Sequence, residues 1–182
     1  VSDHGEGLDP ARGRTWHRLR LHDDLIRVPL IARLPGGAQA GRRVASQVSL
    51  VDVAPSVLDA LGLPPLAGAR GSSWWRALRE GDGQPGGAPR YAFSEAAEYW
   101  DGFQATSVRS PHFKVIRRGA REEEIYDLVE DPQEERNLAG RPHPALRELR
   151  GQLEAFGGAP AAPQPDRDTQ ETLRALGYVD AR

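Results

Sequence analysis

Four short segments between residues 91 and 128 constrain the fold of this chain most strongly. Each is five or six residues long, contains β-branched or aromatic residues and is bounded by polar turn residues; they are Tyr91–Glu95, Gln104–Arg109, Phe113–Arg117 and Glu124–Leu128. Strands joined by short turns pair with their sequence neighbours as an antiparallel meander, whereas parallel strands need long crossover connections. The segments therefore predict a small antiparallel sheet.

An amphipathic helix is expected after this sheet. Between Pro144 and Phe156, apolar side chains recur on one helical face, at Leu146, Leu149, Leu153 and Phe156. Residues 157–167 have the Gly- and Pro-rich composition of a linker. Residues 168–182 are expected to form a final helix and tail, with Asp168 and Glu171 as a capping box.

The first third of the chain follows a different pattern. The run from Ile26 to Leu34 is rich in Ile, Val and Leu, which predicts a strand buried on both faces. Pro29 has no backbone N–H to donate to a neighbouring strand, so this strand should start after Pro29 or lie where the missing hydrogen bond is tolerated. Residues 48–61 predict a helix capped by Asp52 and ended by Gly62. A strand followed by an amphipathic helix is typical of an α/β sandwich.

These patterns divide the chain into five parts. Residues 1–66 belong to the α/β part, residues 67–90 form a Gly- and Pro-rich connection, and residues 91–156 contain the antiparallel sheet with its helix. The linker and the C-terminal helix follow.

The charge balance argues against two classes of partner. With 24 basic and 26 acidic residues the formal net charge is −2, so no global field favours nucleic acid or an anionic membrane surface.

No apolar run in the sequence approaches the roughly 20 residues of a membrane-spanning helix. The absence of cysteine excludes disulfides, thiolate metal sites and thiol nucleophiles within this chain.

The string Ser2-Asp3-His4-Gly5-Glu6 has the chemistry of a metal-binding turn. Asp3 supplies a hard anionic oxygen, His4 an imidazole nitrogen or a hydrogen-bond donor, and Gly5 the backbone freedom for a sharp turn beside them. The same string also fits a plain turn after a strand, in which Asp3 is only a cap. The residues alone leave both interpretations open.

Six segments taken in order resemble one family. They read SDHGE, HDDLIRVPLIARLPGG, VSLVDVAPSVLDALGLP, YAFSE, FKVIRRG and EIYDLVEDPQEERNLA. Their order and approximate spacing are similar to the C-terminal portion of sulfatases in the alkaline phosphatase superfamily. The resemblance covers nearly the whole chain. It implies an α/β fold class: the end of an alkaline-phosphatase-like α/β sandwich, followed by a small antiparallel β-sheet subdomain with C-terminal helices.

The resemblance also implies roles for four residues. In sulfatases the aspartate of this string and the His or Asn after it coordinate a divalent cation, usually calcium, so Asp3 and His4 are the expected metal ligands. A cationic residue upstream of the RVP run contacts the sulfate or the leaving oxygen. His17 is the preferred candidate, as a catalytic proton donor that also binds substrate, against the alternative of a surface histidine. Arg18 is the other substrate-binding candidate; its guanidinium could bind sulfate oxygens but could not donate a proton to the leaving oxygen.

Some residues depart from the family pattern. His22 stands where the family usually has Tyr, and Arg18 stands where Gly often follows the His. Asp23 and Asp24 could also suggest metal ligands. However, this segment leads into the buried strand of the family, which favours capping or exposed polarity for both.

The family's nucleophile is not found in this sequence. Sulfatases use a Cys or Ser within a C/S-x-P-S/A-x-R motif, converted to formylglycine, and this chain has no cysteine and no serine in that context. Two ligands also cannot hold a hard cation that takes six or more donors. We therefore expect an inactive fragment, which needs the missing N-terminal portion of the same fold to hydrolyse the sulfate ester of a small molecule or carbohydrate.

Two alternatives stay open. A phosphodiesterase, phosphonate monoester hydrolase or phosphotransferase of the same superfamily would share the Asp-His metal pair and differ in its nucleophile, Thr or Ser in place of formylglycine. A non-catalytic module would be either a degenerate remnant or a subunit that associates with a separate N-terminal half.

Overall fold

The computed structural model describes residues 1–9, 14–16, 20–80, 90–97, 104–119, 122–157 and 166–175. The first half contains the paired strands β1 (Gly7–Asp9) and β2 (Arg14–Trp16), helix α1 (Asp23–Ile26), the 3-10 turns η2 (Pro35–Gly37) and η3 (Leu50–Asp52), and helices α2 (Val53–Ala60) and α3 (Trp75–Glu80). The second half contains β3 (Ala92–Ala97), β4 (Gln104–Arg109), β5 (Phe113–Arg118), β6 (Glu122–Asp127), α4 (Pro144–Phe156) and α5 (Arg167–Ala175). Within the described residues, every helix is too short or too polar to span a lipid bilayer.

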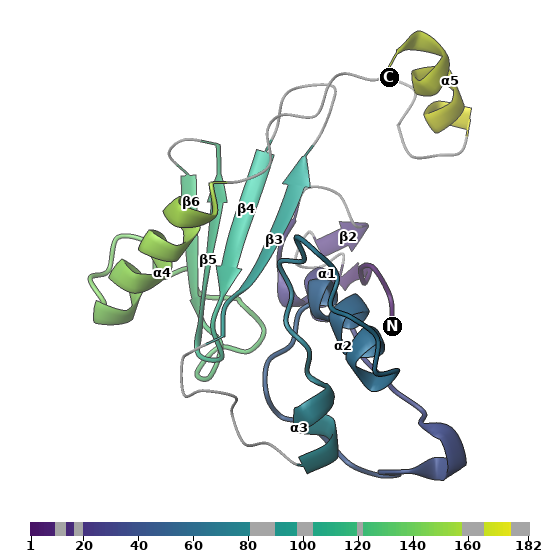
Figure 1. Cartoon of the computed structure of the whole chain (residues 1–182). Helices are drawn as coiled ribbons and strands as arrows, with labels where there is room; N and C mark the ends of the chain where they lie inside the picture. Colours follow the sequence, from purple (N-terminus) through teal and green to yellow (C-terminus); the bar gives the residue numbers. More distant parts are fainter. Residues whose placement is uncertain are drawn as a thin grey trace.

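The four strands of the second half form an antiparallel sheet in the order β3-β4-β5-β6 (Figure 1). Each strand pairs with the next one in the sequence, so the predicted meander is confirmed. Val115 of β5 lies opposite Val108 of β4 and Ile125 of β6. Because side chains opposite each other point to the same side of a sheet, these three residues form one apolar face.

Helix α4 covers this apolar face (Figure 1). The core between helix and sheet consists of residues that are at most 4% exposed: Val108, Val115, Ile125, Leu146, Leu149 and Leu153. The helix begins after His143, whose side chain accepts a hydrogen bond from the Ala145 N–H at 3.2 Å. It ends at Gly157, where a φ of 73° requires the left-handed conformation that glycine adopts freely. The predicted bounds of this helix are confirmed.

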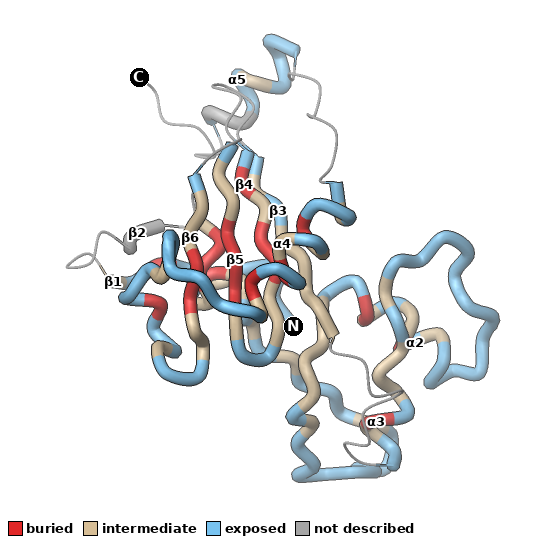
Figure 2. The backbone as a smooth tube through the Cα atoms, turned by 90° about the vertical axis from the view of Figure 1, so that its left-hand side faces the viewer, coloured by how far each residue is buried: buried red, intermediate tan, exposed pale blue. Residues whose placement is uncertain are grey.

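The opposite face of the sheet packs against the segment around α1. Leu21 forms a second buried cluster with Ala105, Ile116 and Tyr126, and Ile26 packs against it. Figure 2 shows that the buried parts of the chain gather along the strands of this sheet and the segments against them. The sheet is therefore the middle layer between α4 and the N-terminal segment.

The buried strand expected at Ile26–Leu34 is not formed. Helix α1 ends at Ile26, and residues 27–34 have neither helical nor strand pairing. None of residues 27–34 is buried, and Ile31 is 84% exposed. A strand needs a neighbour that offers backbone partners along its length, and Pro29 also removes one donor. The described residues provide no such neighbour, so this apolar run remains open to solvent.

Helix α2 forms within the stretch where the sequence predicts a helix, and Gly62 follows it with a φ of 65°. The described residues leave Val57 of this helix 50% exposed and Leu61, which follows it, 67% exposed. Together with residues 27–34, this helix gives the N-terminal half an exposed apolar surface.

Asp52 caps the turn before α2 instead of α2 itself. Its carboxylate accepts hydrogen bonds from the N–H groups of Ser49 at 2.8 Å and Ser72 at 2.7 Å. It also pairs with Arg90 at 2.7 Å. Asp52 is only 3% exposed, and these partners compensate for the burial of its charge.

The cap of α5 also differs from the expected one. Asp166 accepts a hydrogen bond from the Thr169 N–H at 2.8 Å, so Asp166 caps the helix and Asp168 lies in its first turn. Glu171 pairs with Arg167 at 3.4 Å. The side chain of an N-cap aspartate accepts a hydrogen bond from the backbone N–H three residues later, and Asp166 does so two residues before the expected cap.

Candidate metal-binding site

Asp3 and His4 are held beside α1 by the glycine that follows them. The Gly5 N–H donates a hydrogen bond to the Leu25 carbonyl at 2.7 Å. A Cβ at position 5 would lie 2.4 Å from the carbonyl oxygen of Asp24. This contact is too short for any side-chain carbon, so the close approach requires glycine. Gly5 therefore docks the Asp3-His4 pair on the first helix.

The side chains of Asp3 and His4 are close together and open to solvent. Nε2 of His4 lies 3.8 Å from Oδ2 of Asp3, and the side chains of Asp3 and His4 are 88% and 48% exposed. Nδ1 of His4 lies 2.7 Å from the Gly5 carbonyl oxygen. When Nδ1 donates to this carbonyl, Nε2 is the acceptor nitrogen of the neutral imidazole. Hydrogen bonds from the backbone at Asp3 and His4, and then the nearby imidazole, lower the pKa of Asp3.

This pair suits a shared cation. The separation of 3.8 Å is less than twice a calcium–oxygen distance of about 2.4 Å, so one ion can contact both atoms. The carboxylate is a hard oxygen ligand of the kind calcium and magnesium take, whereas imidazole is more typical of transition metals. Within the described ranges, no group of three or more His, Asp and Glu residues could hold an ion by itself. Asp3 and His4 can thus supply two ligands of a larger site.

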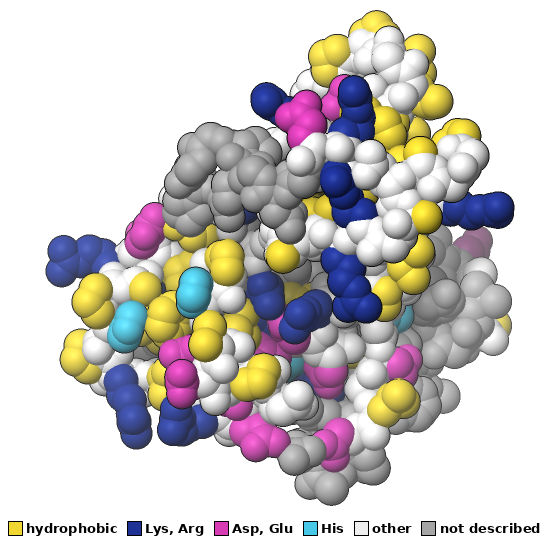
Figure 3. All heavy atoms as spheres, turned by 90° about the horizontal axis from the view of Figure 1, so that it is seen from below, with side chains coloured by type: hydrophobic (Ala, Val, Ile, Leu, Met, Phe, Trp, Pro, Cys, Tyr) yellow, Lys and Arg dark blue, Asp and Glu magenta, His cyan; other side chains and the backbone are white. Residues whose placement is uncertain are grey.

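An open depression of about 1600 Å³ lies beside the pair. Its lining includes Asp3 and His4, the apolar run 27–34, part of β3, and the cationic side chains of Arg20 and Arg109. Figure 3 shows one face of the molecule, on which hydrophobic side chains and charges of both signs are interspersed. The candidate ligands therefore border a surface that combines apolar and charged groups.

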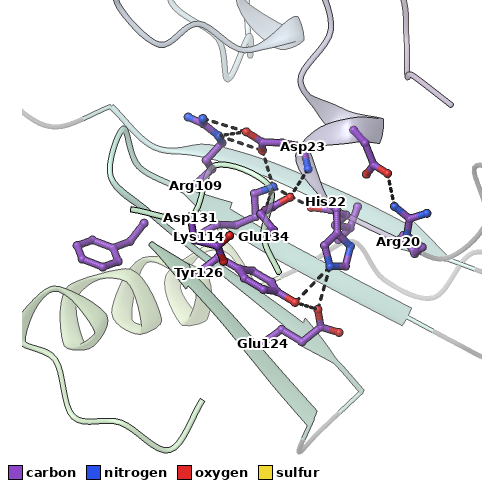
Figure 4. A network of polar contacts seen from close by, with 12 residues as sticks. Arg20, His22, Asp23, Arg109, Lys114, Glu124, Tyr126, Asp131 and Glu134 are labelled. Atoms are coloured by element: carbon purple, nitrogen blue, oxygen red, sulfur yellow. Dashed lines mark hydrogen bonds and ion pairs between the residues drawn. The ribbon is translucent and has the colours of Figure 1, made fainter. Parts of the chain in front are cut away.

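A buried charge cluster fixes α1 on the sheet (Figure 4). We call it the Asp23 cluster; it consists of Asp23, Arg109, Lys114 and Glu134. Lys114 of β5 is fully buried, and its Nζ lies 2.5 Å from Oδ1 of Asp23 and 2.6 Å from Oε1 of Glu134. It also donates to the Leu21 carbonyl at 3.2 Å. A buried ammonium group without such partners would be strongly destabilising.

Asp23 is the member of this cluster that belongs to α1. Arg109 of β4 pairs with its Oδ2 at 3.1 Å, and the Asp23 N–H donates to Oε2 of Glu134 at 2.6 Å. Burial alone would raise the pKa of Asp23, but the charges and hydrogen bonds of Lys114 and Arg109 outweigh it, and the pKa is lowered. The carboxylate is therefore ionised inside the cluster.

A second polar group joins the same segment to strand β6 (Figure 4). Nε2 of His22 lies 3.2 Å from Oε2 of Glu124 and 3.3 Å from the Tyr126 hydroxyl, which itself donates to Glu124 at 2.8 Å. Arg118 pairs with the other Glu124 oxygen at 2.9 Å. The hydrogen bond to His22, together with Tyr126 and Arg118, overcomes the effect of burial and lowers the pKa of Glu124 to about 2.

The remaining residues singled out in the sequence have different outcomes. His17 and Arg18 lie outside the described residues. Asp24 pairs with Arg20, four residues before it, at 2.5 Å, and it is an exposed polar residue as expected. The expectation for Asp23 is wrong: its side chain neither caps α1 nor lies exposed, because two cations on the sheet compensate for its burial.

Sequence reasoning missed the partners of Asp23. One signal was present, because Lys114 is the only lysine among 24 basic residues and stands between apolar residues of a predicted strand. A lysine ammonium group buried in a strand is strongly destabilising unless carboxylates pair with it. Nothing in the sequence indicates which carboxylates these are.

The fold of this chain is that of a known family. Residues 14–156 match the family described as N-sulphoglucosamine sulphohydrolase, C-terminal. The chain therefore belongs to the sulfatases of the alkaline phosphatase superfamily. The expected fold class, an α/β fold that ends in a small antiparallel sheet with C-terminal helices, is confirmed.

Two curated relatives are named as sulfatases, and one solved structure contains a sulfated sugar. The Delta 4,5-hexuronate-2-O-sulfatase of Bacteroides thetaiotaomicron is 30% identical over 146 residues, which are 78% of this chain and 30% of that protein. The ulvan-active sulfatase of Formosa agariphila is 26% identical over 159 residues, 85% of this chain and 30% of that protein. A solved structure in complex with its substrate, D-glucosamine-2-N,6-O-disulfate, superposes with a TM-score of 0.73 at 26% identity, over 85% of this chain and 32% of that one. The chain thus spans about 30% of the length of these curated relatives.

Proposed function

We propose that this chain is part of a sulfate ester hydrolase that acts on sulfated carbohydrates, and that Asp3 and His4 contribute two ligands to its divalent cation site. The observation that carries the proposal is the docked pair, with Gly5 bonded to Leu25 at 2.7 Å and the two side chains 3.8 Å apart. Membership of the sulfatase family supports the reaction class. The relatives named for hexuronate and ulvan, and the one bound to a disulfated glucosamine, support a carbohydrate substrate.

Each proposed site residue has a distinct task. The proposed ion is calcium, which when bound supplies positive charge for the oxygens of the sulfate ester. Asp3 supplies an ionised oxygen, in keeping with its lowered pKa. The Nδ1 contact of His4 with the Gly5 carbonyl sets the ring orientation, as carbonyls commonly do for metal-bound histidines. His17 would donate a proton to the leaving oxygen, and Arg18 would bind sulfate oxygens.

The other parts of the active site are proposed to lie on the remaining part of the fold. These are the further cation ligands and a formylglycine nucleophile. Two observations support this division: the chain spans about 30% of its curated relatives, and it exposes apolar side chains at Ile31, Val57 and Leu61. Large apolar side chains exposed in this way often mark a contact surface, and here the partner would be the N-terminal portion of the same fold.

The proposal is tested by hydrolysis assays on the intact protein that contains this chain. Sulfate release from sulfated glucosamine and hexuronate saccharides is compared with turnover of p-nitrophenyl sulfate, p-nitrophenyl phosphate and a phenylphosphonate ester. We expect sulfate esters to be preferred, and a preference for the phosphonate would contradict the reaction class. The 182-residue chain alone should be inactive with added calcium; turnover would show that it carries a nucleophile of its own.

Variants separate the roles of the site residues. Asp3→Asn should lower kcat/KM by at least about 100-fold and weaken calcium binding, because it replaces an anionic ligand. Glu130→Gln, at an exposed residue in the turn after β6, is the control. His17→Gln should lower kcat most for substrates with poor leaving groups, since these need proton donation. Full activity of Asp3→Asn would refute the metal role.

A further inference from the structure

We infer that Asp23 is a positioning residue for the Asp3-His4 pair, so that the buried Asp23 cluster controls how tightly the pair binds a divalent cation. The inference rests on the proposed function for its functional meaning, although the mechanical link it describes can be measured without any ion. It assigns a role to the buried charges that join α1 to the antiparallel sheet, whose strands are far along the sequence from the candidate ligands.

The first step is the attachment of α1 to the sheet. Helix α1 has four residues, which is too short to be stable by itself. Its position therefore depends on tertiary contacts: the buried Leu25 and the contacts of Asp23 with Lys114, Arg109 and Glu134. Charged hydrogen bonds in a buried site have narrow geometric tolerance. Asp23 consequently fixes both the place and the orientation of this single helical turn.

The second step leads from α1 to the candidate ligands. Leu25 lies in the same turn as Asp23, and its carbonyl accepts the Gly5 N–H at 2.7 Å. The backbone of Gly5 is also pressed against the Asp24 carbonyl, where a Cβ would come within 2.4 Å. Gly5 follows His4 directly, so a displacement of α1 moves the backbone that carries both ligands. The path from Lys114 to the pair is thus continuous. It consists of the ion pair with Asp23, the single turn of α1 and the hydrogen bond from Gly5 to Leu25.

The third step concerns cation affinity. Ligands have to be held within about 0.5 Å of the productive geometry, and contacts behind the ligands change metal affinity by about 10-fold to 100-fold in known sites. Asp3 and His4 are too exposed to be held by packing of their own side chains. The Ser2 hydroxyl donates to the His4 carbonyl at 2.6 Å, which is a contact within the same segment. The link from this segment to the rest of the fold runs through the backbone at Gly5 to α1, and so to Asp23.

Asp24 offers a matched control for this role. It is adjacent to Asp23, has the same side chain, and lies in the same helical turn. Its ion pair is with Arg20, within the same segment, whereas the carboxylate of Asp23 pairs with the sheet. Asp23→Asn is the primary variant, because Lys114 keeps Glu134 as a partner at 2.6 Å and the fold is retained. Asp23→Ala is a second variant that removes the contact completely.

The experiment uses the intact protein and two measurements. Calcium affinity is measured by titration calorimetry, and hydrogen exchange by mass spectrometry of a peptide covering residues 1–8, without metal. We expect Asp23→Asn to raise the calcium Kd about 10-fold and to speed exchange in this peptide, while peptides from β4 and β5 keep wild-type exchange. Asp24→Asn should change the Kd by less than about two-fold, as expected for an i,i+4 ion pair that does not join α1 to the sheet.

Three outcomes would overturn the inference. The first is equal calcium affinities in Asp23→Asn and Asp24→Asn, and the second is unchanged exchange at residues 1–8 in both Asp23 variants. Loss of exchange protection throughout β4 and β5 would also overturn it, because Asp23 would then stabilise the whole sheet. The Asp3→Asn variant tests the proposed function separately. If Asp3→Asn leaves the calcium affinity unchanged, the metal role fails, and the exchange measurement alone decides whether Asp23 positions the N-terminal segment.

Discussion

Glu124 should make the stability of the sheet depend on acid pH. Its carboxylate accepts hydrogen bonds from His22 and Tyr126 and pairs with Arg118, and its pKa is lowered from 4.5 to about 2. A carboxyl group whose pKa is lower in the folded than in the unfolded state stabilises the fold above the unfolded pKa. This contribution is therefore complete above about pH 4.5 and is lost as the pH falls toward 2.

The size of the effect follows from the change in pKa. At about 1.4 kcal/mol per pKa unit, the lowering from 4.5 to about 2 corresponds to roughly 3 kcal/mol. The Glu124 side chain is 14% exposed, and water at its edge reduces this value to about 2 kcal/mol. Linkage then predicts that the contribution falls by about half between pH 5 and pH 3.

Urea unfolding followed by circular dichroism can measure this contribution. Wild type and Glu124→Gln are compared at pH 7, 5, 4 and 3, with Glu130→Gln as an exposed control. The stability difference between wild type and Glu124→Gln should be about 2 to 3 kcal/mol at pH 7 and should shrink toward pH 3. A difference that stays constant from pH 7 to pH 3 would refute the assignment of the lowered pKa to Glu124.

Four other substitutions test the packing. Leu149→Ala, at a residue that is 2% exposed, should lower the unfolding free energy by about 3 kcal/mol, whereas Leu61→Ala, at 67% exposure in this chain, should change it by less than about 0.5 kcal/mol. Gly71→Ala should be strongly destabilising in urea unfolding, since its Cβ would lie 2.0 Å from the Val51 carbonyl oxygen; a wild-type midpoint would contradict this close approach. Gly5→Ala should increase hydrogen exchange at residues 1–8 and leave the β5 peptides unchanged, and loss of protection in β5 would be inconsistent with a local clash.

The sequence predicted those elements whose stability is local. The strands of the sheet pair with their neighbours in the chain, so periodicity and turn residues were sufficient to locate them. Helix α4 was predicted with its bounds because Pro144 begins it, Gly157 ends it, and its leucines repeat at helical spacing. The resemblance to sulfatases came from segment order, and the family assignment of residues 14–156 agrees with it.

The errors concern residues that depend on distant partners. An apolar run such as Ile26–Leu34 becomes a strand only beside another strand, and its own sequence does not specify that neighbour. The role of Asp23 depends on Lys114 and Glu134, which are about 90 and 110 residues away in the chain. Local patterns contain no information on such pairings, so the Asp23 cluster could be found only in the structure.

The order of the strands has a consequence for how this protein folds. Because β3 to β6 pair only with sequence neighbours and α4 follows directly, this subdomain has a low contact order and should form early. The contacts of α1 with the sheet close a loop of about 90 residues and should form later, at a higher entropic cost. The preformed sheet would then act as the template on which the N-terminal segment is ordered, and the Asp3-His4 pair would take its place only in this last step.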